Sequence, residues 1–258
     1  MTTLFFGDPK RPLFGSFHQA STTGRRRAGI LLCYPAPQEY MFAHRAFRRL
    51  AEELARKGHP VLRFDYTGTG DSASDLEDAT LSAWRADVVT AADELGELAN
   101  VDQVSVVGMR LGASLAATVS AEGRRFREIV LWDPIVSGRR AVEELRAIDD
   151  QRYAMSHVKR DPPPIDELCG FPFPAQLRRE LDRLDLLQLP RLATSKVLLL
   201  ASSDDPEMRL LERRLASAGN DVALSVVPDP EALEKRASLG ESLLSRTMID
   251  AVLERIAS

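Results

Sequence analysis

Residues 103–122, with the sequence QVSVVGMRLGASLAATVSAE, have the pattern of a buried strand, a tight turn and a helix. Gly108 and Gly112 flank Arg110 at the centre of the turn. The motif Gly-x-Ser-x-Gly in this setting places a nucleophilic serine on a sharp turn between strand and helix. Arg110 stands where that serine would be, and a protonated guanidinium cannot attack a carbonyl. The segment therefore predicts the architecture of such a site without its usual nucleophile.

Continuous apolar runs alternate with amphipathic stretches along the chain, which indicates a mainly parallel sheet with helices on both faces. The runs predict strands over residues 29–34, 60–65, 103–107, 128–132, 196–201 and 222–227. The amphipathic stretches predict helices over residues 42–57, 80–99, 111–122, 206–218 and 230–256, the last as one helix or two. Residues 4–6 and 13–18 predict an antiparallel hairpin at the sheet edge.

Residues 135–189 interrupt this alternation, because they contain no strand pattern. Helical patterns cover residues 141–153 and 175–185, with proline-rich sequences at 161–164 and 170–174 between them. The insertion is too long for an ordinary connection between a strand and a helix. We expect residues 135–190 to form a helical cap over the carboxyl ends of the strands, where open α/β sheets bind ligands. A second packing layer with no ligand role is the alternative. Residues 1–258 are expected to form a single domain with this cap.

The run VLRFDYTGTGDS at residues 61–72 contains a D-x-x-G-x-G-x-S pattern, whose glycines suit a tight turn. Together with Cys33-Tyr34-Pro35, the altered turn around Arg110 and the sequence LWDP at 131–134, this run resembles α/β-hydrolases of the serine aminopeptidase type. It is also similar to hydrolases associated with exosortase systems, some of which read Gly-x-Arg-Leu-Gly-Ala at the same turn. The resemblance covers nearly the whole chain. It implies an α/β-hydrolase fold with a mostly parallel central sheet of about eight strands.

A hydrolase of this fold needs a serine at the nucleophile elbow, an acid after the next-to-last strand and a histidine after the last strand. Asp204 and Asp205 follow the strand predicted at 196–201 and fill the acid position. The sequence after the last strand is Pro-Asp-Pro-Glu, and no histidine follows His157. Two departures from the pattern predict a protein that does not use ordinary triad catalysis.

Ser114, Cys33 and His44 are the other candidates for a nucleophile or a base. Ser114 lies one helical turn beyond Arg110, where its hydroxyl is expected to pack or to bond a backbone carbonyl. Cys33 ends a strand and would be reactive only if a nearby cation lowered its pKa; a buried structural cysteine is the commoner case. His44 comes closest of the four histidines to the expected pocket, as a general base or as a surface or capping residue.

Arg110 needs a nearby anion, because the positive end of a helix dipole repels it by ~0.3–1 kcal/mol. One hypothesis is an internal salt bridge with Asp133, Asp204 or Asp205. The other is that a ligand supplies a carboxylate or phosphoryl group, which the guanidinium binds while the N–H groups of Leu111 and of the Tyr34 loop add donors. The two hypotheses are compatible.

We therefore expect a pseudoenzyme or a non-covalent catalyst that binds a small molecule carrying an acyl, carboxylate or other anionic group. The expected catalytic residues are Arg110, Asp204 and Asp205, and the expected ligand-binding residues are Tyr34, Gln38, His44, Met109, Leu111 and Asp133. One alternative is an active hydrolase or acyltransferase for an ester, thioester or amide with a displaced nucleophile. Another is a structural pseudoenzyme that binds a protein partner.

The composition indicates which partners and which cellular compartment to expect. A net charge of −4 over 258 residues argues against a nucleic-acid binder. No stretch approaches the ~18 apolar residues that span a membrane, and the N-terminus lacks a signal-peptide pattern. Cys33 and Cys169 suggest neither a disulfide framework nor a metal site. We expect a cytoplasmic protein with no metal and no cofactor; the composition leaves a homo-oligomer open.

Overall fold

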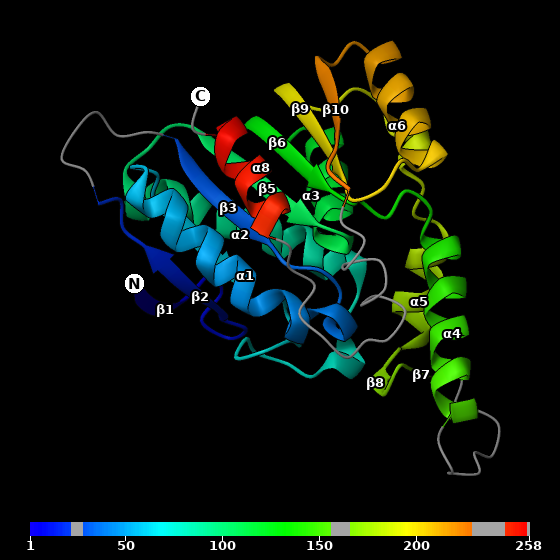
Figure 1. Ribbon diagram of the computed structural model, residues 1–258. Helices are drawn as coiled ribbons and strands as arrows, with labels where there is room; N and C mark the ends of the chain where they lie inside the picture. The colour runs from blue at the N-terminus through cyan, green and yellow to red at the C-terminus, as the bar shows by residue number, and fades with distance from the viewer. Residues whose placement is uncertain (22–27, 156–165, 229–245, 257–258) are drawn as a thin grey trace.

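The computed structural model describes residues 1–21, 28–155, 166–228 and 246–256, and its central sheet has eight strands (Figure 1). In chain order they are β1 (Thr2–Phe6), β2 (Leu13–His18), β3 (Gly29–Cys33), β4 (Val61–Phe64), β5 (Val104–Met109), β6 (Phe126–Trp132), β9 (Thr194–Ala201) and β10 (Val222–Val226). Their order across the sheet is β1-β2-β4-β3-β5-β6-β9-β10. β2 pairs antiparallel with β1 and β4, and all other neighbours are parallel. The predicted edge hairpin and mostly parallel sheet are confirmed.

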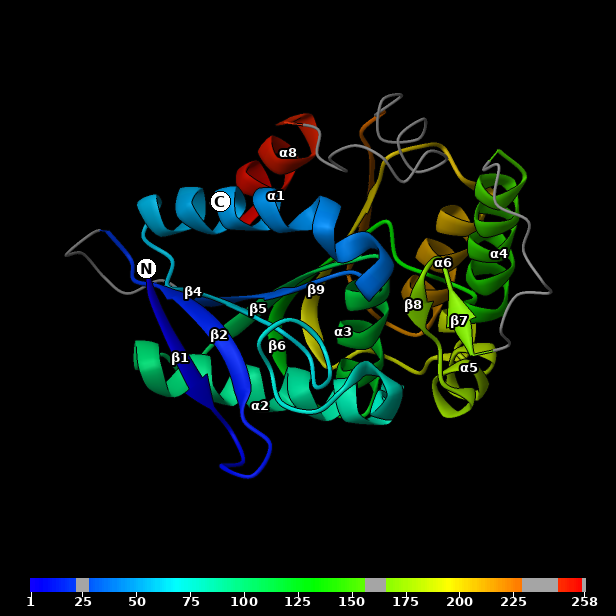
Figure 2. The ribbon, with the colours of Figure 1, turned by 90° about the horizontal axis from the view of Figure 1, so that it is seen from below.

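Helices cover both faces of this sheet (Figure 2). Helices α1 (Pro37–Arg56) and α8 (Arg246–Ile256) lie on one face, and α2 (Leu81–Ala99) and α3 (Leu111–Ala121) lie on the other. Helix α6 (Pro206–Ser217) packs against β9 and β10. In the predicted helix at 230–256, residues 230–245 lie outside the described part of the chain. None of the helices in that part is both long and apolar enough to cross a membrane.

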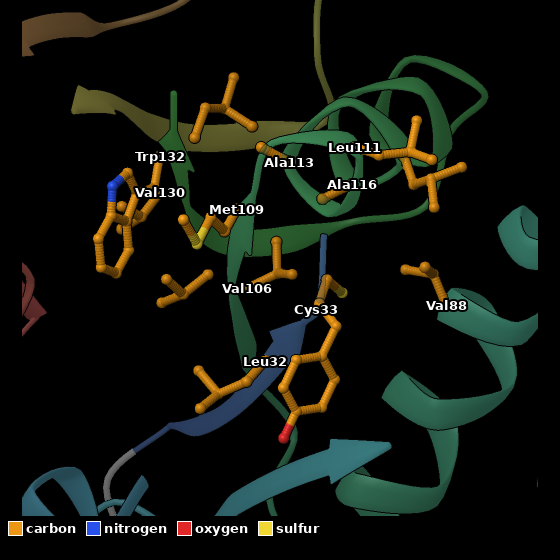
Figure 3. Close-up of a cluster of buried hydrophobic side chains, with 14 of the residues drawn as sticks. Leu32, Cys33, Val88, Val106, Met109, Leu111, Ala113, Ala116, Val130 and Trp132 are labelled. Carbon is orange, nitrogen blue, oxygen red and sulfur yellow. The ribbon is translucent and has the colours of Figure 1, made fainter. Parts of the chain in front are cut away.

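The central strands are buried on both faces. Every residue of β3 and β5 is buried, which explains why their sequences are continuous apolar runs rather than alternating patterns. Figure 3 shows Leu32, Val106 and Met109 in this core, with Ala113 and Ala116 of α3 close to them. The small side chains of α3 allow the helix to lie near the sheet. Arg110, between β5 and α3, is thereby fixed at the carboxyl end of a central strand.

The insertion between β6 and β9 leaves the main sheet. It contains α4 (Gly138–Met155), β7 (Glu167–Leu168), β8 (Phe171–Pro172), α5 (Ala175–Asp182) and the short 3-10 helix η2 (Leu186–Gln188). The expectation that this segment has no strand is wrong, because β7 and β8 form an antiparallel pair. Cys169 and Gly170 both have positive φ, of 53° and 81°, as a two-residue hairpin turn requires. Strands of two residues give no detectable sequence period.

A buried polar network on β4 predicts how stability depends on pH. Arg63 donates from Nε to His18 Nε2 (3.2 Å) and from Nη1 to the Tyr34 hydroxyl (2.6 Å). Burial, and then the charge of Arg63, lower the pKa of His18 to about 4. A histidine in the unfolded chain has a pKa near 6.5, so acid favours the unfolded state.

We expect the free energy of unfolding to fall as pH drops from about 7.5 to 5, with His18 contributing on the order of 2 kcal/mol of this loss. Urea unfolding of wild type and His18→Gln at both pH values checks this, since glutamine keeps an acceptor for Arg63 but does not titrate. The variant should lose less stability in acid. Equal losses in the two proteins would contradict the assignment.

Candidate functional site

The turn between β5 and α3 holds Arg110 in a strained backbone conformation, with φ 52° and ψ −118°. The Arg110 N–H donates to the Trp132 carbonyl (2.9 Å), and its own carbonyl accepts from the N–H groups of Ala113 (3.1 Å) and Ser114 (3.2 Å). A non-glycine residue rarely adopts positive φ, and such strain persists where the surrounding structure imposes it. The predicted strand, tight turn and helix are therefore present, with Arg110 in a strained conformation at the centre of the turn.

The two elbow glycines are explained by close backbone approaches. A Cβ at Gly108 would lie 2.5 Å from backbone atoms of Ala113, and a Cβ at Gly112 would lie 2.3 Å from the carbonyl oxygens of Cys33 and Tyr34. Any side chain at position 112 would force α3 away from the end of β3. The Gly-x-x-x-Gly spacing around Arg110 is thus required by the packing of strand against helix.

Glu39, in the first turn of α1, is the ion-pair partner of Arg110. Its Oε1 lies 3.0 Å from Arg110 Nε, and the side chains of Arg110 and Glu39 are 16% and 7% exposed. Burial opposes the charge of Arg110, but the carboxylates of Glu39 and Asp133, with a smaller contribution from Glu144, raise its pKa above the usual value. The anion that the helix dipole argument required is therefore an internal glutamate.

The expected salt bridge of Arg110 with Asp204 or Asp205 is wrong, whereas the expected Asp133 carboxylate does act on Arg110 and raises its pKa together with Glu39. Asp204 is exposed and pairs with Arg209 Nε at 2.8 Å. The Oδ1 atom of Asp205 accepts the Glu207 N–H (2.8 Å) and caps α6, while Asp133 Oδ1 accepts the Ser202 N–H (2.8 Å). Helix α1 starts at Pro37, five residues before the predicted start, and this places Glu39 over the elbow.

Arg110 lines a polar pocket of about 260 Å³, here called the elbow pocket. Its lining residues follow β5, β6 and β9 or lie on α4 and α6: Arg110, Asp133, Pro134, Ile135, Val136, Ser137, Arg140, Ala141, Glu144, Ser203, Asp205, Glu207 and Met208. Of the predicted site residues, Arg110, Asp133 and Asp205 meet here. Arg140, Glu144 and Glu207 were not predicted; Arg140 lies 3.0 Å from Glu144 and 3.5 Å from Glu207.

An apolar cavity of about 30 Å³ lies under the insertion beside the elbow pocket. Two predicted ligand-binding residues, Gln38 and Leu111, line this cavity with Trp84 of α2 and Phe173 and Leu177 of the insertion. The two hollows share Ile135 and Ala141 in their linings. A polar space and an apolar space therefore adjoin at the carboxyl ends of the strands.

Three predicted ligand-binding residues, Tyr34, His44 and Met109, line neither hollow. Tyr34 is buried and stacks on Phe47, with ring centroids 4.8 Å apart. Met109 is buried at the end of β5 (Figure 3). His44 is half-buried near Tyr34, and burial lowers its pKa. The structure does not bring these three side chains to the elbow pocket.

The two other candidate nucleophiles, Ser114 and Cys33, are buried, and so is Cys169. The Ser114 hydroxyl is fully buried and donates to the Ile135 carbonyl at 2.7 Å. Burial raises the pKa of Cys33 to about 12 and that of Cys169 to about 11. Thiols with such pKa values are almost entirely protonated at neutral pH, so neither cysteine is activated for attack.

Comparisons with known proteins agree on the fold. No family model matches the chain. Palmitoyl-protein thioesterase ABHD10, mitochondrial, from Mus musculus is 28% identical over 193 residues, which are 71% of this chain and 63% of that protein. The corresponding Bos taurus protein is 41% identical over 65 residues, or 25% of this chain and 20% of its own length. The chain thus spans less than two thirds of these curated relatives.

Solved structures match over almost the full length. Est1E from Butyrivibrio proteoclasticus with ferulic acid bound has a TM-score of 0.68 at 16% identity, covering 99% of this chain and 100% of that one. Mouse alpha/beta hydrolase domain-containing protein 10 has a TM-score of 0.61 at 18% identity, with 99% and 97% covered. Proline iminopeptidase from Mycobacterium smegmatis has a TM-score of 0.63 at 15% identity, with 99% of each chain covered. The chain has the α/β-hydrolase fold.

Proposed function

We propose that this protein uses the α/β-hydrolase fold to hold a small molecule with a carboxylate or acyl group beside Arg110, without forming a covalent intermediate. The observation that carries the proposal is the strained backbone of Arg110 at the edge of a pocket. Backbone strain in a non-glycine residue is concentrated at functional sites. If the turn had only a structural role, a glycine at position 110 would adopt the same backbone conformation without this strain.

Arg110 has hydrogen-bond donors that a ligand could use. Glu39 accepts from Nε, whereas Nη1 and Nη2 have no hydrogen-bond partner among the described residues. The planar guanidinium can donate from two nitrogens to the two oxygens of a carboxylate. Glu39 thus orients Arg110, and a bound carboxylate takes the remaining donors.

The protein acts as a binder or as a catalyst of polar chemistry in which Arg110 stabilises a developing oxyanion or enolate. We infer that the insertion at 135–190 caps the site and that residues 1–258 act as one domain. The adjoining apolar cavity, lined by Phe173 and Leu177, suits a small apolar part of the ligand. No step of this account requires a serine or cysteine nucleophile.

The experiment is mass spectrometry of small molecules that copurify with wild type, Arg110→Gln and Arg209→Gln. Arg209 is a matched control, because it also pairs with a carboxylate through Nε but is exposed. We expect a carboxylate-bearing compound to be retained by wild type and by Arg209→Gln, and to fall at least about tenfold in Arg110→Gln. Equal retention of that compound by all three proteins would overturn the role of Arg110.

Thioester or ester hydrolysis with a displaced nucleophile is the second candidate, favoured by the likeness to a palmitoyl-protein thioesterase. The buried hydroxyl of Ser114 and the raised pKa of Cys33 argue against it. Intact mass spectrometry after incubation with a fluorophosphonate, and separately with iodoacetamide, distinguishes the two. We expect no stoichiometric adduct in the native protein. An adduct on a residue of the elbow pocket would replace our proposal with this one.

A further inference from the structure

The charges of the elbow pocket restrict the ligand further than Arg110 alone. Among the lining residues in the described part of the chain, Arg110 and Arg140 are cationic, while Asp133, Glu144, Asp205 and Glu207 bring four carboxylates. These described lining residues therefore carry an excess of two carboxylates over cations. This sign is unexpected for a site that binds a simple anion, because the surrounding carboxylates repel it.

Among the described residues, the ion pairs of Arg110 and Arg140 do not involve Asp205. Arg140 is shared by Glu144 and Glu207, at 3.0 Å and 3.5 Å. Arg110 is paired with Glu39, which lies outside the pocket lining. Asp205 accepts a backbone N–H, which stabilises its carboxylate without neutralising it, and it forms no ion pair within the described ranges.

Two further observations concern residues that line the elbow pocket. Burial raises the pKa of Glu207, and the charges of Asp205 and Glu144 raise it further against the effect of Arg140. The carboxylates on this side of the pocket thus repel one another. Asp133, like Arg110, is a lining residue with positive φ, at 43°. Two of the five non-glycine residues with positive φ in the described part of the chain therefore face one pocket.

We infer that the ligand is a small zwitterion whose carboxylate binds the terminal nitrogens of Arg110 and whose cationic amine lies against Asp205 and Glu207. The inference rests on the proposed function, since it assigns the ligand class of that same pocket. The volume of about 260 Å³ corresponds to roughly nine water molecules, which suits a small metabolite. An amine held by Asp205 and Glu207 removes the repulsion that a plain carboxylate would meet.

Isothermal titration calorimetry with matched probes tests this class. The probes are 4-aminobutanoate, butanoate and butylamine, which share one chain length, with 3-aminopropanoate and 5-aminopentanoate to vary the charge spacing. We expect the best amino acid to bind wild type at least about tenfold more tightly than the carboxylate or the amine of the same length.

Variants assign each charge to its partner. Arg110→Gln should weaken binding of the best amino acid at least about tenfold. Asp205→Asn retains a good helix cap for α6 and should reduce the preference for amino acid over carboxylate to less than about threefold. Asp204→Asn, at the adjacent exposed aspartate, should leave the preference unchanged.

The outcomes separate the two proposals. A carboxylate that binds as tightly as the amino acid, and only in the presence of Arg110, would overturn the zwitterion and retain the proposed function. Binding of the amine alone that is unaffected by Arg110→Gln would overturn both. Failure of every probe to bind at millimolar concentration would overturn the zwitterion, while retention of a carboxylate compound by wild type would still support the proposed function.

Discussion

Replacement of Gly112 by alanine is expected to destabilise the protein by about 3 kcal/mol or more, or to prevent folding. The added Cβ would lie 2.3 Å from the carbonyl oxygens of Cys33 and Tyr34. These are backbone atoms at the end of the central strand β3, so no side-chain rotation relieves the clash. Helix α3 would have to move away from the sheet, and Arg110 would move with it.

Gly96→Ala is the matched control for this prediction. Gly96 lies within α2, and a Cβ there would be 3.5 Å from the Val101 carbonyl, an ordinary contact. Alanine should stabilise this helix by up to about 1 kcal/mol. Urea unfolding of both variants gives the two free energies. A Gly112→Ala protein as stable as wild type would contradict the close packing of α3 on β3 that defines the elbow.

Removal of Glu39 is expected to cost about 3 kcal/mol, because it leaves a mostly buried guanidinium without its counterion at a helix N-terminus. Glu39→Gln should cost less than Glu39→Ala, since the amide oxygen still accepts from Arg110 Nε. Urea unfolding of the two variants measures both costs.

The double variant Glu39→Met with Arg110→Met should recover most of the loss, because no unpaired charge remains. Glu52→Ala is the surface control: Glu52 pairs with Arg48 at 3.0 Å where both side chains are about half exposed, and its loss should cost less than about 1 kcal/mol. If Glu39→Ala lowers the free energy of unfolding no more than Glu52→Ala does, then Glu39 is not a required counterion of Arg110.

Most of the sheet could be predicted because its central strands are buried on both faces and appear as unbroken apolar runs. The two short segments at residues 4–6 and 13–18 also predict the edge hairpin, which β1 and β2 form. The apolar stripe of Phe47, Leu50 and Leu54 predicts a helix over residues 42–57, whereas α1 starts at Pro37. Pro37 at the first helical position, with Glu39 in the first turn, is the signal that would have given the correct start.

The site was predicted only in part, for a physical reason. Arg110, Asp133 and Asp205 each follow a central strand, and the carboxyl ends of parallel strands meet at one edge. Arg140, on α4, faces this edge only because of how the insertion packs. Glu207, on α6, also reaches this edge through tertiary packing. Local sequence patterns do not predict such long-range packing.

The central claim is that Arg110 holds a ligand carboxylate without covalent chemistry, and a crystal structure of the protein soaked with 4-aminobutanoate tests it most directly. We predict electron density for the probe in the elbow pocket, with a carboxylate oxygen within about 3 Å of Arg110 Nη1 or Nη2. Glu39 should remain on Nε. Density that joins a ligand covalently to a side chain, or a probe bound with its carboxylate away from Arg110, would contradict the claim.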